Sequence, residues 1–512
     1  MRYLFVHQNF PGQYRHLVAH LRDDPANEVV FLTEREDRSM ANVRKIVYKT
    51  SRAVSKNTHH YLRQVEHAVL RGQAVARVAL KLKTAGFVPD IMIGHNAWGE
   101  ILYLKDVFPD VPLLGYFEFF RKPWGGCLDF DPEFPADDDA RAKLRTLGSV
   151  DLLGLHAADW GQTATEWQRS EHPACYHDKI SVMHEGIDTD LVRPDPKAQL
   201  VVDGIMLTRN DEVITYVARN LEPYRGFHTF MRALPAILKR RPKAHVVIVG
   251  GDDVSYGRLP PKGETYRTLM LKEVGSRLDM QRVHFMGWVP YDEYVKVLQV
   301  SSAHVYLTYP FVLSWSMLEA MAAECLVIAS STAPVLEVIE NAENGLLVDF
   351  FSTEQIADRI DEALDHPDCM VRIREQARAT IVDRYDLKRK ALPDQLKIID
   401  ELIGRKPSYT AACTPTKSGD TGNSVKPEST LLGKNTTAPL ILSSSVRLTE
   451  KEAEVLDWLR KGKSATEIAR ILDRSEYTVK NQMRGLYEKL GAHSRGQALH
   501  QASQLSIPDR PL

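Results

Sequence analysis

Two arginines stand six positions apart, directly after an apolar run of strand length, Val213–Val217. A guanidinium makes forked, charge-assisted hydrogen bonds to phosphate oxygens, so Arg219 and Arg225 on one strand-exit loop can hold a diphosphate from two sides. Arginines are common on protein surfaces, and the position after a strand is what makes this pair specific. Because Gly226 then opens a helix, we expect an anion-binding loop here.

A second group of polar residues lies in a later apolar segment. Ser314 is expected to be a helix N-cap, so the free backbone amides of Trp315 and Ser316 would face an incoming anion. Glu319 stands one turn further in, where a carboxylate can accept both hydroxyls of a ribose. A solvated helix glutamate is the alternative. The apolar neighbours indicate a largely buried helix, however, in which an unpaired carboxylate is costly.

Two places near the start of the chain give weaker signals. Gly12, after the run Tyr3–Val6, would let the backbone approach a ligand, although a simple strand-to-helix turn explains it equally well. His95 follows Ile91–Ile93 in a stretch of small and polar residues. A buried structural histidine is the alternative there, and by itself His95 favours that interpretation.

The elements that position these groups are apolar runs of strand length alternating with helix-period segments, the pattern of a parallel sheet covered by helices. The pattern begins again after Asp195, which predicts two Rossmann-like domains in tandem. In such sheets ligands collect at the carboxyl ends of the strands, where the groups above lie. The predicted strands are Tyr3–Val6, Val29–Leu32, Ile91–Ile93, Leu113–Phe117, Val213–Val217, Val246–Val249, Val283–Met286, Val305–Leu307 and Leu326–Ala329.

The remaining chain is predicted to form a linker and a third unit. A last helical pattern, Leu387–Ile403, precedes a stretch rich in Thr, Ser, Pro and Gly that lacks apolar periodicity. The predicted fold is therefore α/β, with two tandem Rossmann-like domains followed by a small all-α helix-turn-helix domain. The predicted domains are 1–195 on the acceptor side, 196–405 on the donor side with a final helix that returns to the first domain, 406–445 as a flexible linker, and 446–512.

The last unit consists of capped helical patterns. Thr449 and Ser464 each stand three positions before a glutamate, which is capping-box spacing. The final helix of the helix-turn-helix would present polar side chains suited to the phosphates and base edges of a major groove, although an ordinary polar face is the alternative. These outward residues are Thr478, Lys480, Asn481 and Arg484.

Composition excludes several classes of protein. The chain has 512 residues with 44% hydrophobic and 26% charged, which suits about three soluble domains. Lys+Arg 66 against Asp+Glu 67 argues against a general polyanion binder. Five scattered cysteines offer no metal-binding or redox pair, and neither a signal peptide nor a membrane span is apparent. We expect a reduced, cytoplasmic protein.

The order of these motifs, with His184–Asp188 and Gly287–Val289, resembles the family 4 glycosyltransferases of the GT-B fold over roughly residues 1–400. The resemblance implies transfer from a nucleoside-diphosphate sugar to a polysaccharide, lipid-linked or other glycan acceptor. It also implies retention at the anomeric carbon, with no metal or other cofactor. The site residues that it implies are His95 and Glu319 for catalysis, and Gly12, Arg219, Arg225, Ser314, Trp315, Ser316 and Glu319 for donor binding.

Three positions depart from the family pattern. Arg225 stands where the family usually has lysine, which keeps the charge, and Ser314 replaces a glycine. Phe311 replaces a second glutamate that normally lies beside the donor sugar. The loss of this glutamate is expected to alter the contacts with the donor sugar, and it bears on whether the chain is active.

The region from Leu448 to Ala502 resembles the LuxR-type DNA-binding domain, in the motifs that include Thr478–Asn481 and Lys489–Gly491. Gln482 stands where the domain usually has histidine. The resemblance implies duplex DNA as a partner. Because the net charge of residues 446–512 is only +3, useful affinity would need a dimer, and the segment after Ser494 could supply the dimerising helix.

Two classes of function remain open at this point. The chain is either a sugar transferase with a regulatory DNA-binding tail, or a transcription regulator whose transferase-like domains sense a nucleotide-sugar without turning it over. Arg219, Arg225 and Glu319 are expected in both, whereas Phe311 favours the second.

Overall fold

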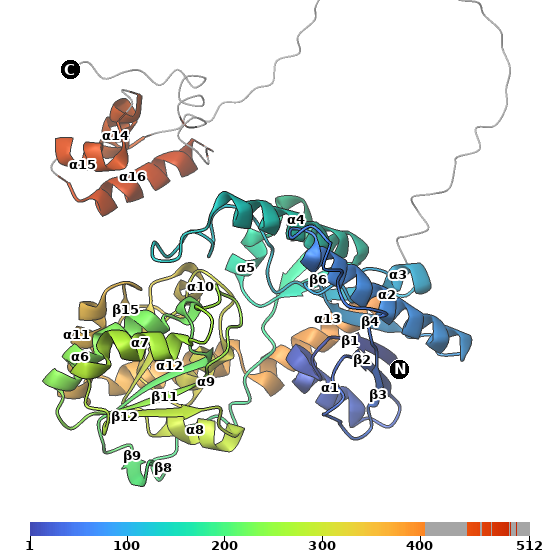
Figure 1. The fold of residues 1–512 in the computed structure, drawn as a ribbon, viewed down its shortest axis with the longest axis horizontal. Helices are drawn as coiled ribbons and strands as arrows, with labels where there is room; N and C mark the ends of the chain where they lie inside the picture. The colour runs from blue at the N-terminus through green and yellow to red at the C-terminus, as the bar shows by residue number, and fades with distance from the viewer. Residues whose placement is uncertain (405–447, 461–462, 473, 491, 493–497, 499–512) are drawn as a thin grey trace, which may run out of the picture. The chain divides into compact units, whose positions relative to one another are not determined.

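The computed structural model describes residues 1–404, 448–460, 463–472, 474–490, 492 and 498. The predicted linker, 406–445, lies outside these residues. The contacts within the chain divide it into two compact units, Met1–Thr416 and Lys417–Leu512. The first unit contains two parallel sheets, each covered by helices (Figure 1).

The first sheet has seven parallel strands in the order β3-β2-β1-β4-β5-β6-β7. Apolar residues on its strands are buried on both faces, under α1 and α13 on one face and α2 and α3 on the other. The strands are β1 (Arg2–Val6), β2 (Glu28–Thr33), β3 (Arg44–Val47), β4 (Ile91–His95), β5 (Leu113–Tyr116), β6 (Trp160–Thr163) and β7 (Ile180–Val182). The helices are α1 (Arg15–Arg22), α2 (Arg63–Thr84), α3 (Leu104–Val107), α4 (Asp138–Ala157) and α5 (Glu166–Glu171).

The second sheet has six parallel strands in the order β12-β11-β10-β13-β14-β15. The strands are β10 (Val213–Asn220), β11 (His245–Gly251), β12 (Val283–Gly287), β13 (Ala303–Tyr306), β14 (Val327–Ser330) and β15 (Leu346–Val348). The helices are α6 (Phe227–Arg240), α7 (Tyr266–Val274), α8 (Tyr291–Gln299), α9 (Trp315–Ala322), α10 (Ala333–Leu336), α11 (Thr353–Asp365), α12 (Val371–Arg384) and α13 (Leu392–Gly404).

The last helix of this unit packs on the first sheet rather than the second. Ile399 and Leu402 of α13 are buried in the cluster that also holds the aromatic residues of β1 (Figure 1). The chain therefore crosses between the domains twice, after β7 and before α13. Both crossings meet at an isolated bridge between Ile187 and Asp386.

The prediction of two tandem parallel sheets is confirmed, and each strand expected from the sequence is present within three residues at either end. The expectations missed β3, β6, β7 and β15, which are short or carry polar residues. They also missed an antiparallel hairpin, β8 (Gln199–Val202) and β9 (Ile205–Thr208). Its exposed apolar side chains, such as Val201 and Met206, do not follow the pattern of a buried parallel strand.

The described part of the second unit is helical, with α14 (Glu450–Arg460), α15 (Ala465–Ile471) and α16 (Glu476–Lys489). Both predicted capping boxes are present, at Thr449 with Glu452 and at Ser464 with Glu467. These caps satisfy amides that would otherwise lack partners at the helix starts. The small core beneath them includes Val455, Leu456, Leu459, Ile468, Val479, Leu486 and Leu490.

Candidate active site

Arg225 is a buried cation with an unusual set of partners. It lies in the short helical turn Pro223–Arg225, after β10, and is 9% exposed. Its Nη1 donates to Thr308 Oγ1 at 2.9 Å and to the Val312 carbonyl at 3.0 Å. No carboxylate among the described residues forms an ion pair with it. Because a buried charge is costly unless it is compensated, this position suits an incoming anion.

Arg219 lies at the carboxyl end of the same strand, β10, but in a different environment. Its side chain is exposed, and no hydrogen bond or ion pair joins it to another described residue. Both arginines lie at the carboxyl edge of the second sheet, as the sequence predicted, although Arg219 is still within β10 and only Arg225 is on the loop after it. Arg225 is held in place, whereas Arg219 has the freedom to reach a ligand from the solvent side.

The start of α9 lies at the same edge. Ser314 is its N-cap, as predicted, and the Ser314 Oγ accepts from the Ser316 amide at 3.3 Å. The expectation that the Ser316 amide is free is therefore wrong, because the cap itself uses that amide. The Ser314 amide in turn donates to Tyr306 Oη at 2.9 Å. The Trp315 side chain reaches the first domain, where its Nε1 donates to Glu185 Oε2 at 2.9 Å.

Glu319 is buried on α9 but is not unpaired. Tyr291 Oη donates to Oε1 and Tyr294 Oη donates to Oε2, each at 2.6 Å. Burial raises the pKa of Glu319, and the two tyrosine hydroxyls act in the opposite direction. The carboxylate is therefore already paired without a ligand, and each of its oxygens keeps a second lone pair that a ribose hydroxyl can use.

Phe311 lies in an aromatic cluster instead of offering a carboxylate. Its ring centroid is 4.7 Å from that of Tyr256, 5.4 Å from Tyr224 and 5.0 Å from Phe119, which comes from the first domain. The Arg225 guanidinium lies 5.8 Å from the Phe311 ring centre. The surroundings of the buried cation are thus aromatic where the family usually has a second acid.

His95 is fully buried at the end of β4. Its Nδ1 accepts from the Ala97 amide at 3.1 Å, which assigns the ring proton to Nε2, and Nε2 lies 3.3 Å from Glu118 Oε2. His7 packs edge-on against it at 5.1 Å, and burial together with His95 lowers the pKa of His7 to about 3. Glu118 also accepts from Gln13 Nε2 at 3.2 Å. The structural and the catalytic interpretation of His95 both fit this geometry.

Gly12 adopts a left-handed backbone, with φ of +58°. An added Cβ would lie 3.0 Å from His7 Nδ1, so the loop passes close over that ring. The close contact with His7 explains why a glycine stands at this position. The approach of this loop to a ligand stays a prediction.

Glu185 is a residue that sequence reasoning did not select as functional. It accepts from the Trp315 indole and from the Tyr116 hydroxyl, and His184 Nε2 lies 3.5 Å from it. It thereby connects the ends of β5 and α9 across the two domains. The motif His184–Asp188 contained the signal, but only the fold brings it beside Trp315.

The outward face of α16 carries the residues predicted for DNA. Thr478, Lys480 and Arg484 are exposed, whereas the side chain of Asn481 lies outside the described part of the structure. Gln482, which replaces the usual histidine, accepts from Arg474 Nη1 at 3.3 Å. Arg474 also pairs with Glu454 at 2.8 Å, so it fastens α16 to α14.

Sequence families match each part of this architecture. Residues 25–192 match the glycosyl transferase family 4 group, and residues 205–380 match the glycosyl transferases group 1. Residues 446–502 match the bacterial regulatory proteins of the luxR family. The chain contains family 4, group 1 glycosyltransferase domains of the GT-B fold and a luxR-type domain. Both resemblances drawn from the sequence are confirmed.

Several curated proteins are similar to this chain over only part of their own length. The D-inositol 3-phosphate glycosyltransferase of Corynebacterium glutamicum is 27% identical over 39% of this chain and 47% of its own. A GDP-mannose-dependent phosphatidylinositol monomannoside mannosyltransferase of Mycobacterium tuberculosis is 28% identical over 50% of this chain and 65% of its own. The chain thus spans about half to two thirds of the length of these relatives.

Solved structures agree on the fold. HepE of Anabaena in complex with UDP-glucose is 14% identical with a TM-score of 0.56, over 78% of this chain and 100% of that one. Sucrose-phosphate synthase of Thermosynechococcus elongatus is 14% identical with a TM-score of 0.60, over 78% and 99%. In the described ranges, no helix combines the length and the apolar character needed to cross a membrane.

Proposed function

We propose that the chain transfers a sugar from a nucleoside-diphosphate sugar to a polysaccharide, lipid-linked or other glycan acceptor, with retention and without a metal ion. The main observation in support of this function is the environment of Arg225. Its side chain is a cation buried beside the start of α9, with no ion-pair partner among the described residues. A nucleoside diphosphate is the anion that family 4 glycosyltransferases release, and Arg225 would receive it.

The proposed roles of the site follow from charge development in the reaction. As the bond between the anomeric carbon and the phosphate oxygen breaks, negative charge grows on the diphosphate. Arg225, the exposed Arg219 and the amide end of α9 would stabilise that charge before it reaches solvent. Glu319 would hold the ribose hydroxyls, and His95 would lie at the reacting sugar on the opposite domain.

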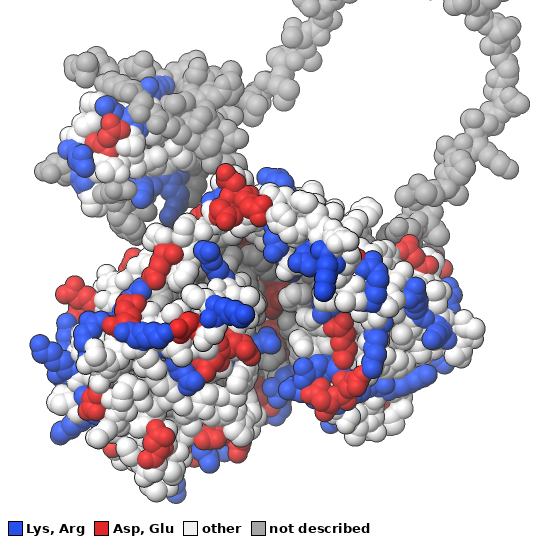
Figure 2. Space-filling model, in the orientation of Figure 1, with Lys and Arg blue, Asp and Glu red and all other residues white. Residues whose placement is uncertain are grey.

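The acceptor is proposed only as a class. Lysines and arginines on the visible face of the molecule are interspersed with carboxylates (Figure 2), which favours a neutral or mixed-charge glycan over a strongly charged polymer. The relatives named above act on an inositol phosphate and on a phosphatidylinositol mannoside, and they support a hydroxyl-bearing acceptor without identifying it.

A panel of nucleotide-sugars tests the function directly. The full chain would be incubated with UDP-, GDP-, ADP- and dTDP-sugars, and release of the nucleoside diphosphate would be measured. We expect release from at least one donor, increased by addition of an acceptor. Absence of release from every donor, with binding retained, would instead support a nucleotide-sugar sensor.

The sensor remains the second candidate, because Phe311 occupies the place of the family's second acid and a luxR-type domain follows. Introducing a glutamate at position 311 distinguishes the enzyme from the sensor. If the chain is an enzyme, Phe311→Glu should lower its activity, because the new carboxylate would lie in the aromatic cluster and form an ion pair with Arg225. A sensor that lacks only the carboxylate should instead gain turnover in this variant.

We also propose that the tail binds duplex DNA through the outward face of α16, as a dimer. The exposed Lys480 and Arg484 support phosphate and base contacts on that face.

A further inference from the structure

A segment of the first domain lies on the second. Residues 127–134 follow β5 and precede α4, yet their apolar side chains pack beside β13 and α6. The Phe130 ring centroid is 5.1 Å from that of Tyr309, and Phe134 lies 5.6 Å from His228. Cys127 is buried in the core of the second domain and accepts from the Tyr224 hydroxyl at 3.5 Å. We call residues 127–134 the strap.

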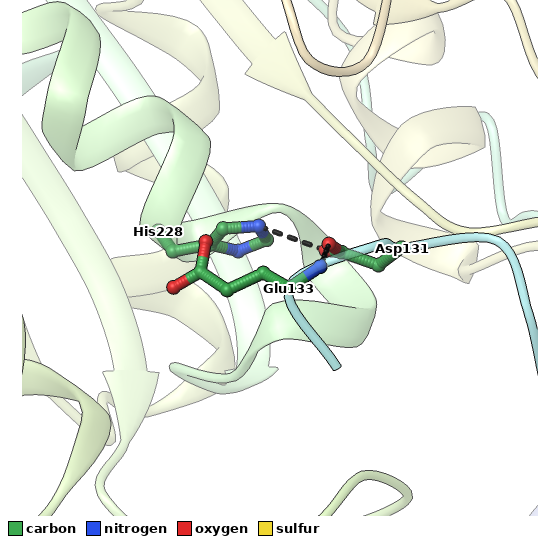
Figure 3. A group of neighbouring side chains, drawn as sticks. All are labelled: Asp131, Glu133 and His228. Carbon is green, nitrogen blue, oxygen red and sulfur yellow. Dashed lines mark hydrogen bonds and ion pairs between the residues drawn. The ribbon is translucent and has the colours of Figure 1, made fainter. Parts of the chain in front are cut away.

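Polar contacts fix the strap at its centre. Figure 3 shows Asp131 and Glu133 on the strap beside His228 of α6. Asp131 Oδ2 accepts from the Tyr309 hydroxyl at 2.6 Å and lies 3.0 Å from His228 Nε2. Glu133 pairs with Arg232 at 2.6 and 3.0 Å. Although burial acts to raise it, the pKa of Asp131 lies below its ordinary value because of His228 and Tyr309.

The same three side chains have atoms within 4.8 Å of one another, a spacing at which a metal ion can bind. Their hydrogen bonds argue for a different role. Each Glu133 oxygen is bonded to Arg232, and Asp131 Oδ2 is bonded to both Tyr309 and His228. A metal would have to displace an arginine and a tyrosine, so we interpret the group as a polar contact between domains.

The contact leads directly to the buried arginine. The Tyr309 ring stacks on Tyr224 with centroids 4.6 Å apart, and the Tyr309 amide donates to the Tyr224 carbonyl at 3.0 Å. Tyr224 immediately precedes Arg225. Asp131 therefore holds, through Tyr309, the backbone from which the guanidinium projects.

We propose that Asp131 is a positioning residue for the donor diphosphate: from the first domain it orients Tyr309 against Tyr224 and so sets the place of Arg225. This inference rests on the proposed function, in which Arg225 receives that diphosphate. It makes donor binding depend on the docking of the strap, since loss of the Asp131 contact frees the strap and the arginine turn together. Sub-ångström placement of a binding group can change affinity by large factors.

Calorimetric titration of the full chain with UDP, GDP and ADP tests the proposal. We expect Asp131→Asn to weaken binding of the preferred nucleotide about tenfold, the order expected for a buried hydrogen bond to a charged group. Tyr309→Phe keeps the ring and removes only the hydroxyl, so it should fold even where the aspartate variant does not, and should show a similar loss. Both variants break the contact between Asp131 and Tyr309, and Asp131→Asn also weakens the contact with His228. The double variant should therefore lose no more than Asp131→Asn alone.

Asp129→Asn is the matched control. Asp129 is on the same strap, but it is more exposed and pairs with Arg141 inside the first domain at 2.5 Å. Its substitution should leave nucleotide binding unchanged. Equal losses in the Asp129 and Asp131 variants, additive losses in the double variant, or no loss in Tyr309→Phe would each overturn the proposal.

Hydrogen exchange gives a readout that needs no ligand. In Asp131→Asn, amides of the strap and of residues 224–226 should exchange faster, while those of β10 and β13 remain protected. A purely structural role would raise exchange throughout the second sheet, and unchanged exchange at 224–226 would refute the positioning role. If wild type binds none of the three nucleotides and releases no nucleoside diphosphate from any donor of the panel, the proposed function fails, and this exchange pattern still decides the inference.

Discussion

At the scale of single residues, the site is defined by how its charges are paired. Arg225 donates only to neutral oxygens, whereas Glu319 accepts from two tyrosines. The arginine therefore gains most from an anionic ligand, since the carboxylate is already partly satisfied. Removing the charge of Glu319 should have the smaller effect on binding.

We predict that Glu319→Gln folds and weakens nucleotide-sugar binding by about 1–2 kcal/mol, because an amide can no longer accept at both oxygens. Calorimetry with the donor found in the panel measures this. Glu324→Gln is the control, since Glu324 follows α9 and lies 3.9 Å from Arg209, away from the tyrosines. Wild-type affinity in Glu319→Gln would remove the ribose role.

The sequence predicted the places of the candidate site residues in the fold better than it predicted their partners. Ser314 is the N-cap that its residue type and position indicate, and both arginines lie at the expected sheet edge. The tyrosines that bind Glu319 come from α8, and Asp131 reaches Tyr309 from 178 residues away in sequence. Such contacts depend on how distant parts of the chain pack together, and this packing cannot be predicted from a local sequence pattern.

At the scale of elements, the same distinction applies. Strands with continuous apolar runs, such as β10 and β11, were predictable because burial on both faces requires them. The edge strand β3 carries Arg44 and Lys45, and β6 contains Gly161 and Gln162, so neither shows such a run. Their pairing is set by neighbouring strands rather than by their own composition.

The cap of α15 makes a prediction about pH. Hydrogen bonds from the Ser464 amide and hydroxyl hold the pKa of Glu467 at about 2, below its ordinary value of 4.5. A lowered folded-state pKa contributes stability that is present above about pH 4.5 and is lost as the pH falls toward 2. Hydrogen exchange of α15 amides should therefore accelerate over this range. Glu467→Gln should lack this component of the pH dependence; an identical profile in the variant would contradict the assignment.

At the scale of the whole molecule, a transferase-type unit and a luxR-type unit share one chain. The sequence predicted both units, because each has its own motifs and its own core. Among the described residues, the small core of the second unit is built from residues of its own helices and the segments beside them. DNA binding should therefore be separable from donor chemistry.

We predict that the full chain binds duplex DNA with an affinity that falls steeply with salt, because phosphate neutralisation releases counterions. Arg484→Ala should weaken binding by about 1–3 kcal/mol or relax sequence preference, while nucleotide binding stays unchanged. Mobility shifts on genomic fragments at low and high salt provide the test. Arg470→Ala, exposed on α15, is the control, and the absence of any shift at low salt would favour a protein-docking role.

Arg225 is proposed to hold the diphosphate of a donor that the chain cleaves. The most direct measurement is the rate of nucleoside diphosphate release from the best donor, compared among wild type, Arg225→Lys and Arg225→Ala. We expect lysine, which keeps the charge, to retain most of the rate, and alanine to raise the barrier by about 2–3 kcal/mol, which slows release roughly 30- to 150-fold. A folded Arg225→Ala protein that releases the diphosphate at the wild-type rate would contradict it.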